Sequence, residues 1–249
     1  MASGCNPLGT GQSPAAVRGL DLGRPMSGHG NNSPTAMSKT LNFDDAFRSR
    51  LRDLFVWRRD VRRFRQDPLP DGALERLIEI ACLAPSVGLS QPWRFVVVDD
   101  PGHRTRIQQN FEICNSTALA AQTPERAALY VQLKLAGLRE APGHLAVFAD
   151  HSTPKGHGLG RHTMPEMIDY SVVTAVHTMW LAARSEGIGM GWVSILDPQA
   201  VAVILDVPLN WRFIGYFCLG FPDFEHNIPE LEQAGWERRC SASSFIVRR

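Results

Sequence analysis

Several stretches of the chain carry apolar residues at helical spacing. Between Asp44 and Trp57 they fall at i, i+4, i+7 and i+8, which is the stripe of an amphipathic helix, and Asp44 is suited to cap its N-terminus. A second helix is predicted between Asp71, as its cap, and Pro85, which ends it. The remaining predicted helices span 101–115, 124–140, 165–187 and 198–205.

Short apolar runs between these helices predict the strands. The runs lie at 94–98, 144–148, 191–195 and 213–219. They alternate irregularly with the helices, and several strands are joined by long segments that contain helices. This order predicts an α+β fold with a mixed central sheet flanked by helices, and it disfavours a regular βαβ repeat. Residues 150–163 are rich in Gly, His and Pro without a period, which predicts a long loop that acts as a lid.

The beginning of the chain differs in composition from the rest. Within residues 1–40, Gly, Ser, Pro, Asn and Thr supply 22 positions, and Phe, Ile, Trp and Tyr do not occur. Such a segment cannot bury enough apolar surface to offset its loss of conformational entropy on folding. We therefore predict a disordered tail over 1–42 and one folded domain over 43–249.

Composition and charge exclude several classes of protein. The 249 residues are 44% hydrophobic and 20% charged, which is enough to build a core, and the formal net charge is +1. Without the tail the charge is −1, which argues against binding to nucleic acid or to an anionic membrane. The five widely spaced cysteines form no CxxC pair and favour a reducing compartment. Because we find neither a membrane-spanning apolar run nor a secretory signal, we expect a soluble cytoplasmic protein.

The densest basic cluster follows the first predicted helix. It reads Arg58-Arg59-Asp60-Val61-Arg62-Arg63-Phe64. Alternate side chains of an extended segment point to the same side, so Arg58 and Arg62 can converge on one phosphate with Asp60 between them. A solvated charged turn at the end of a helix is the alternative interpretation.

A second unusual stretch joins a predicted helix to a predicted strand. Residues 84–93 read Ala-Pro-Ser-Val-Gly-Leu-Ser-Gln-Pro-Trp, with two prolines, a glycine and several small polar groups. Backbone N–H groups in such a rigid loop can face the polar edge of a ligand. An ordinary rigid connection is the alternative.

Together these two stretches resemble the FMN-dependent nitroreductase family. In that family an R-x-[ST]-x-[RK]-x-F segment binds the flavin phosphate and ring edge, and a P-S-x-x-N-x-Q-P-W loop lies against the isoalloxazine. The matching residues are Arg58, Asp60, Arg62, Phe64, Pro85, Ser86, Gln91, Pro92 and Trp93. The resemblance covers about 47–239 and includes the glycine-rich run 187–192. It implies a nitroreductase-like three-layer fold and a domain-swapped homodimer whose flavin sites lie across the subunit interface.

Two departures from the family pattern point to one branch of it. Asp60 replaces a small hydroxyl residue and Leu89 replaces the usual Asn, as in the 5,6-dimethylbenzimidazole synthases. The stretches that carry this likeness are 86–95, 163–167, 170–171 and 191–198. The likeness implies that reduced FMN is the substrate and O₂ the co-substrate. The products would be 5,6-dimethylbenzimidazole, the lower ligand of vitamin B12, and erythrose 4-phosphate, and NAD(P)H would act only indirectly through a separate flavin reductase.

The same likeness implies catalytic roles for two residues. Asp60 would transfer a proton, and its neighbouring arginines would favour the ionised form that acts as a base. Ser194 would hydrogen-bond the flavin ring or its oxygen adduct. Met164 and Met167, in a loop over 150–167, would cover the ring and exclude water.

The likeness also implies residues that bind the flavin. Arg58, Arg62 and Arg239 would anchor the phosphate, because the family commonly places a further cation near the C-terminus, and Arg238 is the alternative to Arg239. The other expected contacts are Arg59, Asp60, Val61, Ser86, Leu89, Gln91, Ser194 and Leu196.

Two further patterns do not support sites of their own. His151, His157 and His162 are spaced by six and five residues, which fits no standard zinc pattern, so no metal site is expected. The glycine-rich runs at 156–160 and 187–191 do not open a helix after a strand with an acidic residue about 20 positions later. A Rossmann dinucleotide site is therefore not expected.

Two other functions stay open on the sequence. A conventional FMN-dependent NAD(P)H nitroreductase or quinone reductase would retain its flavin through repeated turnover. A flavin- or corrinoid-binding module without catalysis would bind FMN tightly and would cause no oxygen-dependent loss of flavin.

Overall fold

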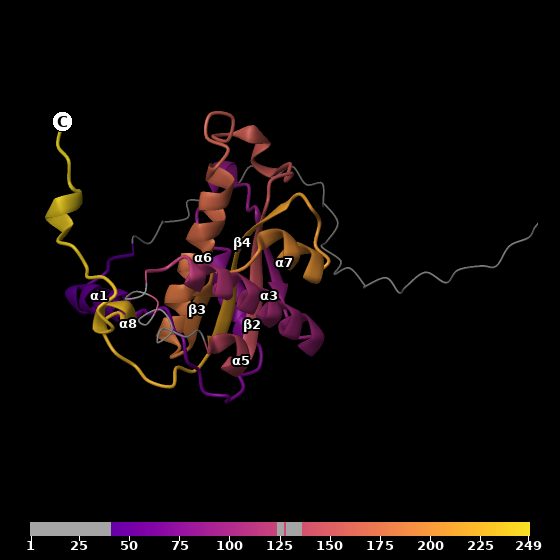
Figure 1. The fold of residues 1–249 in the computed structure, drawn as a ribbon. Helices are drawn as coiled ribbons and strands as arrows, with labels where there is room; N and C mark the ends of the chain where they lie inside the picture. Colours follow the sequence, from indigo (N-terminus) through magenta and orange to yellow (C-terminus); the bar gives the residue numbers. More distant parts are fainter. Residues whose placement is uncertain (1–40, 124–126, 128–135) are drawn as a thin grey trace, which may run out of the picture. The chain divides into compact units, whose positions relative to one another are not determined.

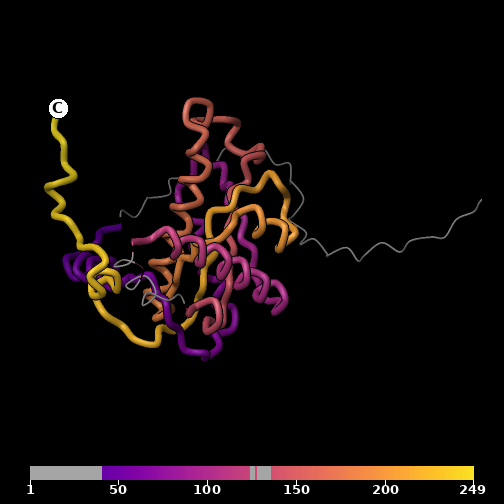
Figure 2. The backbone as a smooth tube through the Cα atoms, in the orientation of Figure 1, coloured from indigo at the N-terminus to yellow at the C-terminus, as the bar shows by residue number. Residues whose placement is uncertain are grey.

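The computed structural model describes residues 41–123, 127 and 136–249 (Figures 1 and 2). The chain divides into two units after Asn42, and the account below concerns the second, Phe43–Arg249. The predicted disorder of the tail, and most of the helix predicted over 124–140, lie outside the described residues.

The helices follow the sequence pattern, with two changes at their starts. They are α1 Asp45–Trp57, α2 Ala73–Ala81, α3 Pro101–Ala120, α5 Gly137–Glu140, α6 Met167–Ser185, α7 Pro198–Ile204 and α8 Glu230–Gln233. Asp44 caps α1 as predicted, because its Oδ1 accepts a hydrogen bond from Phe47 N at 2.7 Å. The predicted cap of α2 is wrong, since Gly72 precedes the helix and no side chain caps it. The long helix α6 begins at Met167 and not at Pro165.

The four strands form one sheet in the order β1-β2-β4-β3. Their bounds are β1 Trp93–Val97, β2 Gly143–Asp150, β3 Gly189–Val193 and β4 Trp211–Gly220. Against the expectation of a mixed sheet, all three ladders between these strands are antiparallel. Parallel pairing among the described residues is confined to one bridge, between Asp60 and Met190, where the arginine-rich segment lies along β3.

Helices cover both faces of this sheet, which gives the predicted three layers (Figure 1). Side chains of α2 and α6 pack on one face, against Leu145 and Val147 of β2. Side chains of α3, α5 and α7 pack on the other face, against Ala146 and Phe148. Every residue of β2 is buried for this reason, as expected for a central strand.

The segments that join the helices and strands contain short helical turns. Three short 3₁₀ turns lie within them, at η1 Val87–Leu89, η2 Lys155–Gly158 and η3 Ala242–Phe245. The predicted long loop after β2 thus contains one short turn. Among the helices that the structure describes, none has the length and apolar character needed to cross a membrane.

Candidate active site

The arginine-rich segment is fixed along β3 by backbone and side-chain hydrogen bonds. Val61 N donates to Met190 O at 3.1 Å, and the Asp60 carboxylate accepts a hydrogen bond from Trp192 N at 2.8 Å. Phe64 anchors the end of the segment in the core, with only 4% of its surface exposed. Asp60 and its neighbours therefore have a defined place beside β3.

Two glycines of β3 make this close approach possible. A Cβ added to Gly191 would lie 2.1 Å from Val61 O, and one added to Gly189 would lie 2.8 Å from Val61 Cγ2. Any larger residue would push the segment away from the strand. The glycine-rich run therefore serves the docking of the arginine-rich segment, and it does not open a helix as a dinucleotide fingerprint does.

Asp60 is the acidic group of this segment. Burial raises the pKa of its carboxyl, and the hydrogen bond from Trp192 N, together with Arg62 and Arg58, opposes that rise. The arginines favour the ionised form of Asp60, as expected, but burial has the larger effect, so the pKa is raised on balance. A raised pKa brings the group closer to the range in which it can both accept and return a proton.

The guanidinium groups of Arg58, Arg59 and Arg239 lie close enough to influence one another's charge. Arg58 stacks over the Trp180 ring at 4.9 Å, and Arg59 donates to the carbonyl oxygens of Arg58 and Asn227. Burial lowers the pKa of Arg58 and of Arg59, and in both cases the nearby charge of Arg239 lowers it further. Mutual repulsion of this kind indicates a site that an anion would stabilise.

One donor in this cluster has no partner. Arg59 Nε is buried and makes no hydrogen bond to any described residue. An unpaired buried donor costs about 1–3 kcal/mol, so a ligand oxygen that reached it would be favoured. The cluster and this donor fit the phosphate of FMN.

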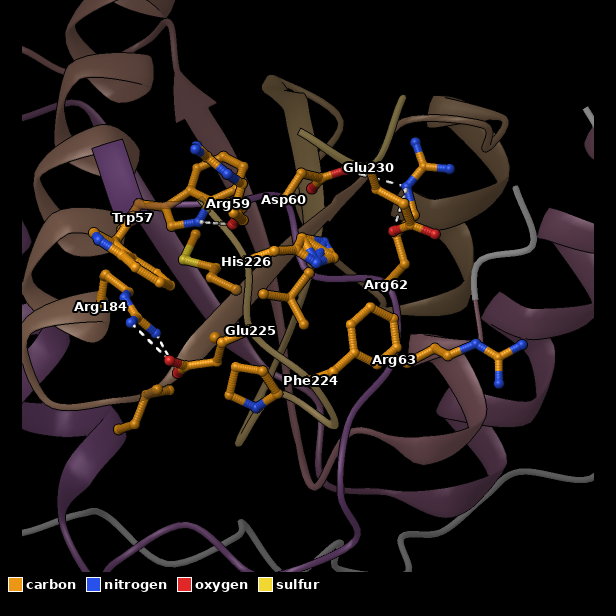
Figure 3. A pocket seen from close by; sticks show the side chains of 16 residues that line it. Trp57, Arg59, Asp60, Arg62, Arg63, Arg184, Phe224, Glu225, His226 and Glu230 are labelled. Carbon is orange, nitrogen blue, oxygen red and sulfur yellow. Dashed lines mark hydrogen bonds and ion pairs between the residues drawn. The ribbon is translucent and has the colours of Figure 1, made fainter. Parts of the chain in front are cut away.

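A pocket of about 500 Å³, a volume that includes open solvent, borders the segment (Figure 3). Its walls come from the end of α1, the segment itself, the C-terminal end of α6, the start of β3, and the stretch from Pro222 to Glu230 after β4. Arg184 of α6 forms hydrogen bonds of 2.5 and 3.0 Å with Glu225 of that loop, and its guanidinium lies 5.8 Å from the Trp57 ring. These three residues, together with His226 and Glu230, were missed by the sequence reasoning, because their contacts join segments that are distant along the chain.

Arg62 lies between two carboxylates of this region. Its Nε is 3.9 Å from Asp60 Oδ2 and 3.8 Å from Glu230 Oε2. The side chain is only 12% exposed. Arg62 is therefore close to Asp60 as predicted, whereas the guanidinium of Arg58 points to Trp180.

The loop predicted to lie against the flavin ring is elsewhere in the same chain. Val87 N donates to Ser171 Oγ at 3.0 Å near the start of α6, whereas Trp180 Nε1 donates to Arg59 O at 3.1 Å near its end. Trp180 lies nine positions after Ser171, which corresponds to about 14 Å along the helix. One chain thus does not bring Ser86, Leu89 and Gln91 against the arginine cluster.

This loop is nevertheless well defined. Ser86 Oγ accepts a hydrogen bond from Gln91 N at 3.1 Å, and Lys155 Nζ donates to Gln91 Oε1 at 3.4 Å. Leu89 and Gln91 have φ values of 55° and 45°, which are uncommon for residues other than glycine. Leu89 is 74% exposed, so it presents an apolar surface that no described residue covers.

The remaining residues predicted to contact the flavin differ in how exposed their side chains are. Ser194 is exposed directly after β3, two residues beyond the hydrogen bond from Trp192 to Asp60. Leu196 is only 7% exposed and packs in the core below α7, so it would reach a flavin through its backbone. Met164, near the C-terminal end of the predicted lid 150–167, is 49% exposed.

The histidines of the loop do not gather at one point. His151 Nε2 lies 2.7 Å from Asp169 Oδ1, which ties the loop after β2 to α6. In the part of the chain that the structure describes, no group of three His, Cys, Asp or Glu side chains is placed to hold a metal ion. His177 is exposed on α6.

Comparison with known proteins assigns the chain to a family. The model of the nitroreductase family matches residues 55–221. The chain belongs to the nitroreductase family. Members named 5,6-dimethylbenzimidazole synthase are 58% identical in Rhodospirillum rubrum and 43% identical in Rhodobacter capsulatus. Both matches cover 79% of this chain, with 93% and 95% of the relatives, and relatives of this similarity show that the chain is an enzyme.

Solved nitroreductase-like structures have the same fold. A crystal structure of oxidised iodotyrosine deiodinase bound to FMN and 3-iodo-L-tyrosine is 26% identical, with a TM-score of 0.63 over 80% of this chain and 97% of that chain. A nitroreductase family protein from Clostridium difficile is 18% identical, with a TM-score of 0.58 over 78% and 95% of the two chains. The predicted α+β nitroreductase-like architecture is thereby confirmed.

Proposed function

We propose that this nitroreductase family member forms 5,6-dimethylbenzimidazole from reduced FMN and O₂, with erythrose 4-phosphate as the second product. The observation that carries the proposal is a carboxylate, Asp60, held on β3 directly beside a cluster of arginines. The high identity to proteins named for this reaction supports the same conclusion. Reduced FMN would then be the substrate, and its reactivity toward O₂ would provide the oxidative chemistry.

The protein's part in this reaction is to bind, to exclude water and to move protons. Arg58, Arg62 and Arg239 would hold the phosphate, as the resemblance implies. Arg59 would join them, because the like charges of Arg58, Arg59 and Arg239 and the unpaired Arg59 Nε favour an anion there. Asp60 would accept and return a proton at the ring, for which its raised pKa suits it. Ser194 would donate a hydrogen bond from the end of β3.

We further propose that two copies of the chain build each flavin site. No residue of α1 is buried, and its apolar side chains Phe47, Phe55 and Trp57 are 37%, 48% and 38% exposed. Phe245 and Val247 near the C-terminus are 73% and 69% exposed. A second copy that covered these surfaces could also bring its own Ser86–Gln91 loop to the arginine cluster, which the loop of the same chain does not reach.

The test of the reaction is direct. Purified protein is mixed with chemically reduced FMN in air, and the products are separated by chromatography. We expect 5,6-dimethylbenzimidazole from the wild type and at least a hundredfold less from Asp60→Asn, whereas the exposed Asp206→Asn serves as a matched control. Ser194→Ala is expected to lose product as well. Quantitative return of oxidised FMN without a new product would refute the synthase and favour a conventional nitroreductase.

The supporting proposals have tests of their own. Sedimentation of the purified protein is expected to give a homodimer. Deletion of residues 1–42 is expected to leave product formation unchanged, because the candidate site lies in Phe43–Arg249. A separate flavin reductase as the source of reduced FMN, and a cytoplasmic location, stay predictions.

A further inference from the structure

Residues 155–160, within the predicted lid, pack directly on residues 86–91, the loop that the resemblance places against the flavin ring. The contact joins two backbones. A Cβ added to Gly156 would lie 2.8 Å from Gly88 O, and one added to Gly88 would lie 2.9 Å from Gly156 O. The two glycines also have positive φ values, of 78° and 57°. A larger residue at either position would therefore push the two loops apart.

The 86–91 loop has a backbone conformation that is unfavourable by itself. Leu89 and Gln91 have φ values of 55° and 45°, a region that residues with a side chain rarely adopt. Hydrogen bonds from Leu89 N to Ser86 O, at 3.0 Å, and from Gln91 N to Ser86 Oγ, at 3.1 Å, close the loop on itself. Such conformations persist only where the surrounding structure holds them.

Contacts from α6 and β2 hold the two ends of this loop. Val87 N donates to Ser171 Oγ of α6 at 3.0 Å. Directly after the loop, Pro92 O accepts a hydrogen bond of 2.8 Å from Asp150 N at the end of β2. Leu89 lies between these two points, so the strained centre of the loop depends on another support.

Residues 155–160 supply that support. A Cβ added to Gly156 would lie 3.1 Å from the Cβ of Ser90, which is only 1% exposed. Lys155 Nζ donates to Gln91 Oε1 at 3.4 Å. The contact thus reaches the strained part of the 86–91 loop.

The supporting loop is itself fixed to the body of the protein. Its base is closed by a hydrogen bond of 2.9 Å from Arg161 Nη1 to Thr153 O, and Thr153 is only 2% exposed. His151 Nε2 lies 2.7 Å from Asp169 Oδ1 of α6. Residues 155–160 can therefore transmit this fixed position to the loop on which they pack.

We propose that residues 155–160 are a brace, with Gly156 as its positioning residue, which holds the 86–91 loop in the shape that meets the flavin ring. The inference rests on the proposed function for its catalytic meaning. The bracing itself is a property of the flavin-free protein. Loosening the brace would leave the phosphate site intact, because the arginine cluster lies near the other end of α6.

The first experiment measures the 86–91 loop in the full, flavin-free chain by hydrogen–deuterium exchange and mass spectrometry. In Gly156→Ala we expect the amides of Leu89 and Gln91 to exchange about tenfold faster or more, with β2 unchanged, because overpacking separates the loops. Gly187→Ala is the matched control. Its φ is +74°, its added Cβ meets nothing within 4 Å, and it should leave this exchange as in the wild type.

A complementary pair of substitutions tests the same contact without Gly156. A Cβ added to Gly160 would lie 2.7 Å from Val87 Cγ2. Gly160→Ala should therefore speed exchange in the 86–91 loop. Val87→Ala removes the atom that is met, so in the Val87→Ala background the same change should have no such effect. Additive effects of the two substitutions would overturn the inference.

The second experiment links the brace to the reaction. With reduced FMN and O₂, Gly156→Ala should form about tenfold less 5,6-dimethylbenzimidazole and return oxidised FMN and hydrogen peroxide in its place, because the ring is held less exactly. Its affinity for FMN should fall only about threefold or less, because the phosphate site is unchanged. A merely structural role would lower stability and affinity together with the yield.

The outcomes separate the brace from the proposed function. Unchanged exchange of the 86–91 loop in Gly156→Ala would overturn the brace. Faster exchange with an unchanged yield would overturn its part in the reaction. Faster exchange in this variant, when the wild type itself forms no product, would support the brace and refute the proposed function.

Discussion

Substitution of Gly191 by Ala tests whether the docking of the arginine-rich segment on β3 builds the site. The new Cβ would lie 2.1 Å from the carbonyl oxygen of Val61, where ordinary contacts begin at 3.4 Å. The neighbouring atom belongs to the backbone, so a side-chain rotation cannot relieve the overlap. The segment must retreat by about 1.3 Å.

The size of the effect follows from what this movement breaks. The hydrogen bonds of 3.1 Å from Val61 N to Met190 O and of 2.8 Å from Trp192 N to Asp60 would both stretch beyond hydrogen-bonding range. Two such bonds contribute about 1 kcal/mol each, and overpacking costs about 1–3 kcal/mol. We therefore expect Gly191→Ala to lose about 3–5 kcal/mol of unfolding free energy.

Flavin binding should fall together with stability, because Arg58 and Asp60 move with the segment. Urea unfolding measures the stability. A fluorescence titration with FMN, at a temperature where the variant is folded, measures flavin binding, and we expect at least a tenfold loss of affinity. Gly187→Ala is the matched control. It lies in the same glycine-rich run at φ +74°, its added Cβ meets nothing within 4 Å, and its cost should be about 1 kcal/mol with unchanged affinity. Equal losses of unfolding free energy and of FMN affinity in Gly191→Ala and Gly187→Ala would refute the role of the close approach at Gly191.

Three further predictions concern other parts of the molecule. Gly156→Ala should speed tryptic cleavage of the loop after β2 at least tenfold relative to Gly187→Ala, because its Cβ would lie 2.8 Å from Gly88 O; equal rates would contradict the contact. Burial lowers the pKa of His144 to about 4, whereas its value in the unfolded chain is about 6.5. Between pH 4 and pH 6.5 this imidazole is therefore protonated in the unfolded state and neutral in the folded state, so acid favours unfolding. Wild type should therefore lose about 3 kcal/mol of unfolding free energy between pH 6.5 and 4 that His144→Gln does not lose, as measured by urea unfolding at each pH. Arg59→Ala should weaken FMN binding at least tenfold in a fluorescence titration, and unchanged affinity would remove Arg59 from the phosphate site.

Local patterns in the sequence are enough to predict the helices and strands of this fold. The apolar period and the Asp44 side chain are enough to place α1, because a helix and its cap depend on residues within a few positions of one another. The apolar runs place all four strands to within two residues at every end for a similar reason. The arginine-rich and Pro-Ser segments, taken together, also indicated the family, since their residue types and spacing carry the resemblance.

The relations between these elements were decided by the tertiary structure. No local pattern predicts that Glu230 meets Arg62, since 168 positions separate them and only the loop after β4 brings them together. The net direction of the Asp60 pKa shift also depends on burial, which the whole fold creates, whereas the arginines beside it in the sequence suggested the opposite direction. The sequence thus indicated the arginine-rich segment and Asp60 within it, because residue type and local spacing are properties of the chain itself. Their distances, burial and sharing of charge arise only when segments remote in the sequence pack against each other.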